Sequence, residues 1–470
     1  MDATSAPQGA AAGEDSAPGD LSPGGPAPFG LALPGYLGLC LVLGGASGDG
    51  PILNGVVQLA GVALLWRASG HAAAPDLAGT AVLRALRYLL LALAAWIVLQ
   101  LVPLPAGLWT ALEPRGTIAA QMALLGNVPG WRPLAIEWER TLVSMTGFIP
   151  PLAVAAMAVR AERAALGRAV AVLAAVAVAA LLLGAAQVIA GSQHDLTFYR
   201  HTVAGAPAGF FANYNHAATL LCAAAALAIP GAVPQRRPGD QPGFAWLGWL
   251  ALAALFVAGA LLNRSLAGLG LGLAVAAYCA LVLVNRKLTG IGRRVAAGAA
   301  LLATAAAGLA IWFAPRSLAD QFLVENASVQ SRGYLWAQTW QAVGDSFPAG
   351  VGLGNFRWVF PRYEDLQVTL ANYANHAHND WLEFLLEGGL FALVLLALLG
   401  WLIAAAARAA LAGAPAGEPV RRLAPFVVLA ILMAHSVVDY PLRTAALAAV
   451  GALALVMAMR GYALGERRTD

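Results

Sequence analysis

The sequence is poor in charged residues and in cysteine. Only 11% of its 470 residues are Asp, Glu, Lys or Arg, whereas about a quarter of the residues in a soluble domain are charged. This shortage excludes a soluble globular protein. The three cysteines, Cys40, Cys222 and Cys279, all lie inside apolar runs. Their odd number and wide spacing exclude a disulfide framework and a cysteine metal site, so we expect them to be small buried side chains.

Long apolar runs are what the sequence has in quantity. The mean hydropathy is +0.71, and stretches long enough to cross a bilayer recur through most of the chain. No stretch has the short alternating pattern of an outer-membrane strand. We therefore predict an all-α polytopic membrane protein with about 12 transmembrane helices. The predicted spans are residues 31–47, 51–66, 82–103, 142–159, 169–190, 209–230, 244–262, 266–285, 295–313, 381–407, 423–440 and 443–460.

The predicted spans form two groups with tails at both ends. Residues 31–313 would hold nine spans, and residues 381–460 would hold the last three. Residues 1–30 are rich in Ala, Pro, Gly and Ser and contain no Lys or Arg. We expect them to be a disordered N-terminal tail, and they lack the positive start of a cleavable signal. Residues 461–470 would form a short C-terminal tail.

Lys and Arg are distributed unevenly between the two sides of the predicted bundle. An even number of spans puts both termini on one side, and that side collects 18 of the 28 Lys and Arg residues. Most of these 18 lie in short loops, where positive charge marks the cytoplasmic side. Both termini are therefore predicted to be cytoplasmic. The long loops 104–141 and 314–380 would lie on the other side, the second of them between spans 9 and 10.

An amphipathic segment follows in the second long loop. In "SRGYLWAQTWQAV", one helical face carries Leu335, Trp336, Thr339, Trp340 and Val343. A short helix lying on the membrane surface would have this pattern. A helix packed over the mouth of the bundle would have it equally.

Three arginines stand beside apolar segments on the same predicted side. Arg200 lies between spans five and six, Arg264 lies in the tight turn "NRSLAG", and Arg332 opens the amphipathic segment. Each one alone is compatible with a side chain that snorkels to the interface. Together they predict a site for an anion attached to a lipid, because a guanidinium matches phosphate oxygens and stays charged in an apolar setting.

Two histidines, His376 and His378, lie just before the tenth predicted span in "NHAHND". Their spacing would let them share a metal on a strand, but no third ligand has recognisable spacing, and the pair alone is weak evidence for a metal site. A histidine at a water-accessible membrane edge is well suited to act as a general base. Asn379 and Asp380 would cap or orient the following helix.

Ionisable residues recur near the outer end of span eleven, in "AHSVVDYPLR". Such groups are costly inside a membrane and indicate function by default. Asp439 would orient His378 or pair with an arginine, and a purely structural pair with Arg443 is the alternative. His435 lies four residues before Asp439 and shares its helical face.

An Asn-rich motif, "NYNHAAT", opens the sixth predicted span. Asn213, Asn215 and His216 would bind sugar hydroxyls or form hydrogen bonds between helices. The three glycines of "PAGVGLGNF" do not make a GxGxxG pattern and no Lys-Ser/Thr follows, so a nucleotide loop is not indicated. We expect these glycines to allow tight turns or close backbone packing.

These motifs, taken in order, resemble the O-antigen ligase and O-antigen polymerase superfamily. The resemblance rests on "LQLVPLPAGLW", an Arg ahead of "GFFANYNHAATLL", "NRSLAG", "SRGYLW…FPAGVGLGNF…HAHNDWLEFLLEGG" and "HSVVDYPLR", and covers most of residues 80–450. It implies a glycosyltransferase C-like bundle in the bacterial inner membrane with an active site that faces the periplasm. Loop 104–141 would then be periplasmic, and loop 314–380 would be the periplasmic catalytic loop.

The resemblance also implies an activity and roles for particular residues. Members transfer a glycan from an undecaprenyl-pyrophosphate carrier to lipid A–core or to a growing polysaccharide, and they use no metal or other cofactor. By position, His378 matches the family's base, with His376 left open as the alternative. Arg264 and Arg200 match its arginines, which with Arg332 would hold the pyrophosphate. Asp439 would orient the base, and Asn379 with the Asn-rich motif would contact the glycan or acceptor.

Other functions remain open at the level of sequence. Ligase and polymerase differ in their acceptors, and no motif here separates them. A protein O-oligosaccharyltransferase of the same superfamily is an alternative, as is a transporter or flippase for the same lipid-linked glycan. A transporter needs polar groups along a path through the membrane midplane, whereas spans 169–190 and 295–313 are almost wholly apolar. A structural or assembly protein is a third possibility, disfavoured by the converging arginines.

Overall fold

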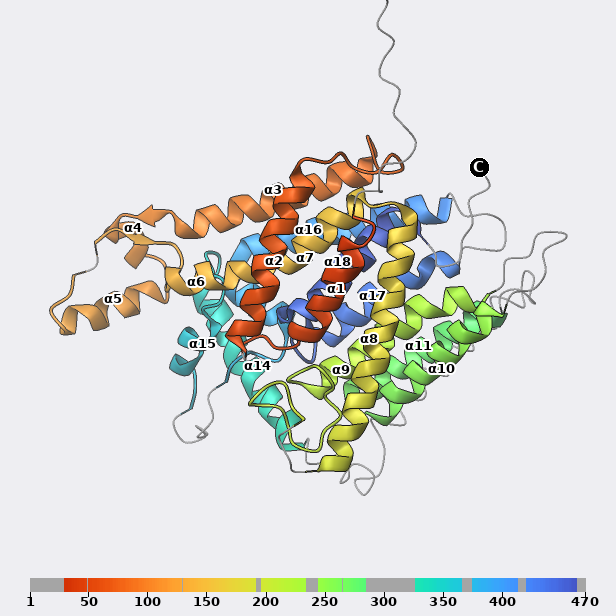
Figure 1. The fold of residues 1–470 in the computed structure, drawn as a ribbon. Coiled ribbons are helices and arrows are strands. Elements are labelled where there is room, and N and C mark those ends of the chain that lie inside the picture. Colours follow the sequence, from red (N-terminus) through yellow and green to blue (C-terminus); the bar gives the residue numbers. More distant parts are fainter. Residues whose placement is uncertain are drawn as a thin grey trace, which may run out of the picture.

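The chain is a bundle of apolar helices in a computed structural model (Figure 1). The structure describes residues 29–48, 50–128, 130–191, 196–233, 244–263, 265–284, 326–365, 374–412 and 420–462. Within these residues the one sheet is a two-stranded antiparallel pair, β1 (Pro103–Leu104) and β2 (Arg132–Pro133). Everything else that is regular is helical.

The bundle consists of long apolar helices. Eight segments of the described residues are long and apolar enough to cross a membrane, with α6 and α7 counted as one, and α1 and α18 are shorter apolar helices. The helices are α1 (Ala32–Leu43), α2 (Pro51–Ser69), α3 (Ala81–Leu101), α6 (Trp138–Met145), α7 (Ile149–Arg160), α8 (Arg163–Ala190), α9 (Tyr214–Ala228), α10 (Ala245–Leu262), α11 (Leu266–Val284), α16 (Asp380–Ala412), α17 (Ala424–His435) and α18 (Ala445–Met459).

This architecture confirms the prediction of an all-α polytopic membrane protein. Helices occupy every predicted span except residues 295–313, which lie outside the described residues. The total of twelve spans therefore stays a prediction. The disordered tail predicted for residues 1–30 also lies almost wholly outside the description, as does most of the predicted C-terminal tail 461–470.

Helix α9 lies at the centre of the bundle. Its sequence, "YNHAATLLCAAAALA", is dominated by alanine, and every residue from Asn215 to Ala228 is buried. Small side chains let neighbouring helices approach closely in a membrane, where packing replaces the hydrophobic effect as the driving force. Helices α8, α10, α11 and α17 all pack against α9. The start of α9 is thereby held at a fixed place in the interior.

The connections between helices gather at two opposite ends of the bundle, because consecutive spans alternate in direction. One end, here named the histidine end, carries the connections 44–50, 102–137, 196–213 and 436–444, together with residues 332–365 and 374–379. Contacts tie them together. Gly45 N–H donates to the Tyr199 hydroxyl at 3.0 Å, and Asn263 Nδ2 donates to Pro207 O at 3.1 Å.

The opposite end, here named the arginine end, is built around Asp76. The Asp76 carboxylate lies 3.1 Å from Arg163 Nη2 and 3.1 Å from Arg460 Nε. Arg421 donates to Pro230 O at 3.0 Å at the same end. The excess of positive charge thus gathers at the end where the sequence predicts the cytoplasm.

Four further helices belong to the connections at the histidine end. They are α4 (Ala106–Thr110), α5 (Arg115–Leu124), α14 (Asn326–Ser346) and α15 (Phe356–Val359). The two long loops are locked together, because the fully buried Arg115 donates to Leu134 O of the first loop and, at 2.7 Å, to Gly350 O of the second. Figure 1 shows α14 and α15 lying together near α6.

Helix α14 packs on the bundle rather than standing free. Thr339 and Val343 are buried, and Leu335 and Trp336 pack against an apolar cluster that includes Phe356. Trp340 is 63% exposed and lies away from that cluster. Four of the five residues on the predicted face therefore pack inward, as expected for a helix over the mouth of the bundle.

The glycine-rich loop 348–354 forms backbone hydrogen bonds with α16 at the point where that helix is broken. The helix is broken at Gly389, with φ 53° and ψ −132°. Across the break, Leu390 N–H donates to Pro348 O and Gly352 N–H donates to Glu387 O, both at 2.9 Å. A Cβ at Gly350 would lie 2.6 Å from Glu387 O. The glycines thus permit close backbone packing, as expected from the sequence.

Candidate active site

Asp439 is the buried centre of a polar cluster at the histidine end. It lies between α17 and α18, and its residue surface is 0% exposed. Its Oδ2 accepts hydrogen bonds from Asn213 Nδ2 at 3.1 Å and Asn215 Nδ2 at 3.0 Å, and its Oδ1 accepts the Tyr440 N–H at 2.9 Å. A carboxylate without such donors would be strongly disfavoured in this environment. The Asn-rich motif thus holds the carboxylate in place.

Four cationic or titratable side chains surround the same carboxylate. His378 Nδ1 lies 3.2 Å from Oδ1 and His216 Nε2 lies 3.8 Å from it, while Arg332 Nη2 and His435 Nε2 lie 3.7 and 3.9 Å from Oδ2. Burial alone would raise the pKa of Asp439, but the neighbouring imidazoles of His216 and His378 hold that pKa well below its usual range. Asp439 is therefore ionised at neutral pH.

The start of α9 adds to the positive field at Asp439. Asn213 is the N-cap residue of α9, and its Oδ1 accepts the Asn215 N–H at 2.9 Å while its Nδ2 donates to Asp439. The amino end of a helix carries a partial positive charge. Asn213 and Asn215 therefore tie the start of α9 to the connection between α17 and α18 through hydrogen bonds, which is close to one of the two roles expected for them.

His378 combines a strained backbone with a partly open side chain. Its φ is +49°, which is uncommon for a residue other than glycine and frequent at functional sites. The side chain is 26% exposed. Its Nδ1 faces Asp439 at ion-pair distance, although the N–H is not well aligned with the oxygen. Its Nε2 makes no hydrogen bond with any residue that the structure describes.

His376 is held on both ring nitrogens. Nδ1 lies 2.9 Å from Glu383 Oε1, and Nε2 lies 2.9 Å from the Ser47 hydroxyl. Its ring packs against Tyr440 with centroids 4.3 Å apart. His378 contacts the same tyrosine at 4.9 Å. The two histidines therefore contact the same aromatic ring and have separate carboxylate partners.

The remaining predicted residues lie around this cluster at different distances. Asn379 Oδ1 accepts the Leu382 N–H at 3.0 Å and caps α16. Arg200 is exposed at the same end of the bundle and makes no hydrogen bond or ion pair with the described residues. Arg264 lies outside the described residues. Its neighbours Asn263 and Ser265 are buried at the histidine end, where Asn263 contacts the 196–213 connection.

The sequence prediction missed a second buried cluster beside the first. Arg443 pairs with three carboxylates of α16: Glu387 at 2.9 Å, Glu383 at 3.4 Å and Asp380 at 3.5 Å. Burial would lower the pKa of Arg443, but Glu383, Glu387 and Asp380 raise it above its ordinary value. Among the described residues Arg443 is therefore a partner of α16 and not of Asp439. A signal was available, because "DWLEFLLEGG" places three acids along one helical face at the edge of a span.

Glu387 serves a different loop from its neighbour Glu383. Its Oε1 accepts the Gly354 N–H at 2.8 Å, which fixes the glycine-rich loop. The backbone N–H groups of that loop already donate hydrogen bonds within the protein, to Glu387, Leu386 O and Gln100 Oε1. This occupancy fits an anchoring loop rather than a phosphate-binding one.

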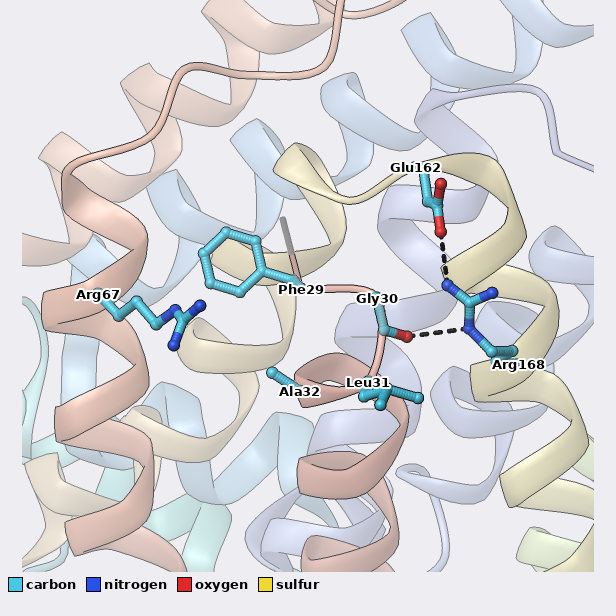
Figure 2. A pocket seen from close by; sticks show the side chains of 7 residues that line it. All are labelled: Phe29, Gly30, Leu31, Ala32, Arg67, Glu162 and Arg168. Carbon is cyan, nitrogen blue, oxygen red and sulfur yellow. Dashed lines mark hydrogen bonds and ion pairs between the residues drawn. The ribbon is translucent and has the colours of Figure 1, made fainter. Parts of the chain in front are cut away.

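Metal-ligand geometry and a hollow elsewhere in the bundle can be compared with the Asp439 cluster. In the part of the chain that the structure describes, no three His, Cys, Asp or Glu side chains converge as metal ligands. A hollow lined by Phe29, Arg67, Glu162 and Arg168 lies at the arginine end, opposite Asp439. Figure 2 shows Arg168 donating to Glu162 and to Gly30 O in this hollow. The titratable groups of the candidate site are not part of it.

Comparison with known proteins identifies one region of the chain. Residues 246–397 match the family model described as O-antigen ligase. This region contains Arg332, His376, His378 and Glu383, whereas Asp439 and the Asn-rich motif lie outside it. No curated protein matches the chain.

Proposed function

The chain belongs to the O-antigen ligase and polymerase superfamily, and we propose that it transfers a glycan from an undecaprenyl-pyrophosphate carrier to an acceptor hydroxyl. The multi-pass membrane bundle and the family match support a glycosyltransferase of the O-antigen ligase or polymerase type. The donor is a lipid-linked glycan and the acceptor a polysaccharide. The carrier, the mechanism and the residues below are the proposal.

The observation that carries the proposal is the pairing of His378 with Asp439. Because Nδ1 faces a buried carboxylate at 3.2 Å, the Nδ1–H tautomer is favoured and Nε2 is left to accept a proton. The same carboxylate stabilises the imidazolium that forms. His376 is bound at both nitrogens, so His378 is the better base of the two.

The reaction is a direct displacement. The acceptor oxygen forms a bond to the anomeric carbon of the donor sugar, while the bond from that carbon to the carrier's phosphate oxygen breaks. The electron pair leaves with undecaprenyl pyrophosphate, and the acceptor's proton passes to Nε2 of His378. Attack from the face opposite the leaving group inverts the anomeric configuration. A positioned base of this kind contributes about 10²- to 10⁴-fold in rate.

Arginines at the histidine end would bind the leaving pyrophosphate. Arg332 is 17% exposed and reaches Asp439 with one nitrogen, which leaves other donors of its guanidinium for the substrate. Arg200 is exposed at the same end, and Asn263, which precedes Arg264 in the sequence, donates to Pro207 O in the 196–213 connection that also carries Arg200. Guanidinium groups stabilise the negative charge that develops on phosphate oxygens in the transition state.

The active site would face the periplasm of the bacterial inner membrane. The arginine end supports this orientation, because the short loops there carry most of the positive charge. Arg163, Arg421 and Arg460 are buried or half-buried close to these loops. Positive loops mark the cytoplasmic side. The histidine end, with both long loops, is then periplasmic, and both termini are cytoplasmic.

Release of free carrier tests this function. Purified protein is mixed with a synthetic undecaprenyl-pyrophosphate glycan and an acceptor polysaccharide, in parallel reactions with and without EDTA. The proposal predicts stoichiometric release of undecaprenyl pyrophosphate and a longer or newly attached glycan. An intact donor that has only crossed a vesicle membrane would mean a flippase instead. Abolition of transfer by EDTA alone would mean that a metal takes part.

A further inference from the structure

The turn that carries His378 is held by a residue outside the catalytic pair. The backbone of His378 is in the left-handed region at φ +49°, which costs about 1–3 kcal/mol for such a residue unless its surroundings enforce it. The side-chain contact with Asp439 fixes the ring, and Trp336 Nε1 donates to His378 O at 3.3 Å at the end of the turn. His376 and Ala377, at the start of the turn, are held by a further contact.

Glu383 makes that contact from the first turn of α16. Its Oε2 accepts the Ala377 N–H at 2.8 Å, and its Oε1 lies 2.9 Å from His376 Nδ1. Glu383 is 1% exposed, so both bonds form away from water, where charge-assisted hydrogen bonds are strong. One carboxylate therefore grips the side chain of His376 and the backbone immediately before His378.

Arg443 in turn holds Glu383. Arg443 Nη1 lies 3.4 Å from Glu383 Oε1, and Arg443 belongs to the same 436–444 connection as Asp439. That connection also binds the first residue of α16, because Ser436 Oγ donates to Asp380 at 2.9 Å. A single connection between α17 and α18 thus controls both the ring of His378, through Asp439, and its backbone, through Arg443 and Glu383.

We propose that Glu383, oriented by Arg443, is a positioning residue that holds the 376–378 turn so that Nε2 of His378 meets the acceptor hydroxyl. This inference rests on the proposed function, because it assigns Glu383 to the work of the His378 base. Glu383 does not touch the reacting atoms. Its removal changes the placement of the base without removing the base, the arginines or the carrier site.

Glu387 provides a matched control on the same helix face. It is equally buried and also pairs with Arg443, at 2.9 Å. Its other oxygen binds Gly354 N–H rather than the His378 turn. Glu387→Gln therefore removes the same charge beside the same arginine, while the contacts of residues 376–378 stay intact.

The kinetic test compares Glu383→Gln with Glu387→Gln in the carrier-release assay. A carboxamide has one accepting oxygen and no charge. Glu383→Gln can therefore keep the Ala377 bond only by donating its NH2 to His376 Nδ1 in the other tautomer, and it loses the charge that strengthens both bonds. We expect kcat to fall about 10- to 100-fold, as for other residues that orient a reacting group, with KM for the donor within about twofold of wild type. Glu387→Gln should lower the melting temperature to a similar extent and leave kcat within about threefold.

A second variant and a second measurement protect the test from misfolding. Glu383→Asp keeps the charge against Arg443 but is one methylene too short to reach both partners, so it should fold and also lose kcat. Hydrogen–deuterium exchange of the resting protein reports the turn directly. Peptides covering residues 374–379 should exchange faster in both Glu383 variants and at the wild-type rate in Glu387→Gln.

The possible results distinguish a failure of the Glu383 positioning role from a failure of the proposed function. If His378→Ala is inactive while both Glu383 variants keep wild-type kcat, the positioning role is wrong and the proposed function stands. If both Glu387→Gln and Glu383→Gln lose kcat equally, the effect is general destabilisation and the inference also fails. Full activity of His378→Ala would place the base elsewhere and overturn the role of Glu383 with it, whereas a wild-type protein that releases no carrier would overturn the proposed function.

Discussion

Nδ1 of His378 lies 3.2 Å from Oδ1 of Asp439, although the two residues come from different elements. His378 ends the loop before α16, and Asp439 lies between α17 and α18. The pair forms only when these two connections meet at the histidine end of the bundle.

Replacing the two neighbouring histidines should have unequal effects. His378→Ala removes the proton acceptor and should lower kcat by about 10²- to 10⁴-fold with normal membrane insertion. His376→Asn removes a side chain whose two nitrogens are already bound to Glu383 and Ser47, so it should cost much less. Initial rates of carrier release measure both. Robust transfer by His378→Ala would place the base elsewhere.

Asp439 should make stability depend on pH in the acid range. Its folded-state pKa is depressed, so its contribution to stability is complete above the unfolded-state pKa, about 3.9. The contribution is lost as the pH falls below that value toward the folded pKa. Titration of Asp439 should therefore leave the melting temperature of the wild type unchanged between pH 8 and pH 5. At pH values below about 4, it should lower the melting temperature.

Asp439→Asn is the control for that pH dependence. It should have a lower melting temperature at pH 7 and a smaller further loss in acid, because the titrating group is gone. Thermal unfolding in detergent, followed by tryptophan fluorescence, measures both proteins. Parallel curves for the two proteins down to pH 3 would show that Asp439 carries no such stabilisation.

Arg264→Lys tests the proposed pyrophosphate contact in the turn between α10 and α11. Lysine keeps the charge but lacks the planar fork that binds two phosphate oxygens. We expect kcat/KM for the carrier-linked donor to fall at least about tenfold, which corresponds to about 1.4 kcal/mol. Unchanged turnover would mean that Arg264 only snorkels to the membrane surface.

Gly350→Ala tests the anchoring of the glycine-rich loop. The new Cβ would lie 2.6 Å from Glu387 O, and the backbone has φ +70°. Strain of this kind costs about 1–3 kcal/mol, so the melting temperature should fall. Gly344→Ala is the control, because a Cβ there meets nothing within 4 Å and the residue is helical. Equal melting temperatures for both variants would contradict the close packing.

Much of the fold and part of the site could be predicted from the pattern of apolar and polar residues in the sequence. Apolar runs of membrane length mark helices whatever they pack against, and polar residues such as Asp439 and His378 stand out because they are costly at the edge of such runs. The pattern could not decide between His378 and Arg443 as the partner of Asp439. That choice depends on which connections meet in three dimensions.

Glu383 shows where prediction from the sequence ends. Its distance from His376 and Ala377 is only a few residues along the chain, but its role depends on the turn of the backbone at His378 and on Arg443 from a distant connection. The sequence places Glu383 one turn into a helix and on the same face as Asp380 and Glu387, but it does not show which residues that face meets. The Asn-rich motif is similar, because its amides turn toward Asp439 only once α9 is buried beside α17.

The most direct measurement is the structure of the protein with a carrier-linked donor and an acceptor bound, determined by electron cryo-microscopy on the inactive His378→Gln variant. The pyrophosphate should lie at the histidine end against Arg332, with the acceptor hydroxyl within about 3.2 Å of the position of the residue 378 side chain. A pyrophosphate bound in the hollow beside Phe29 and Arg67, or at any site remote from Asp439, would contradict the account.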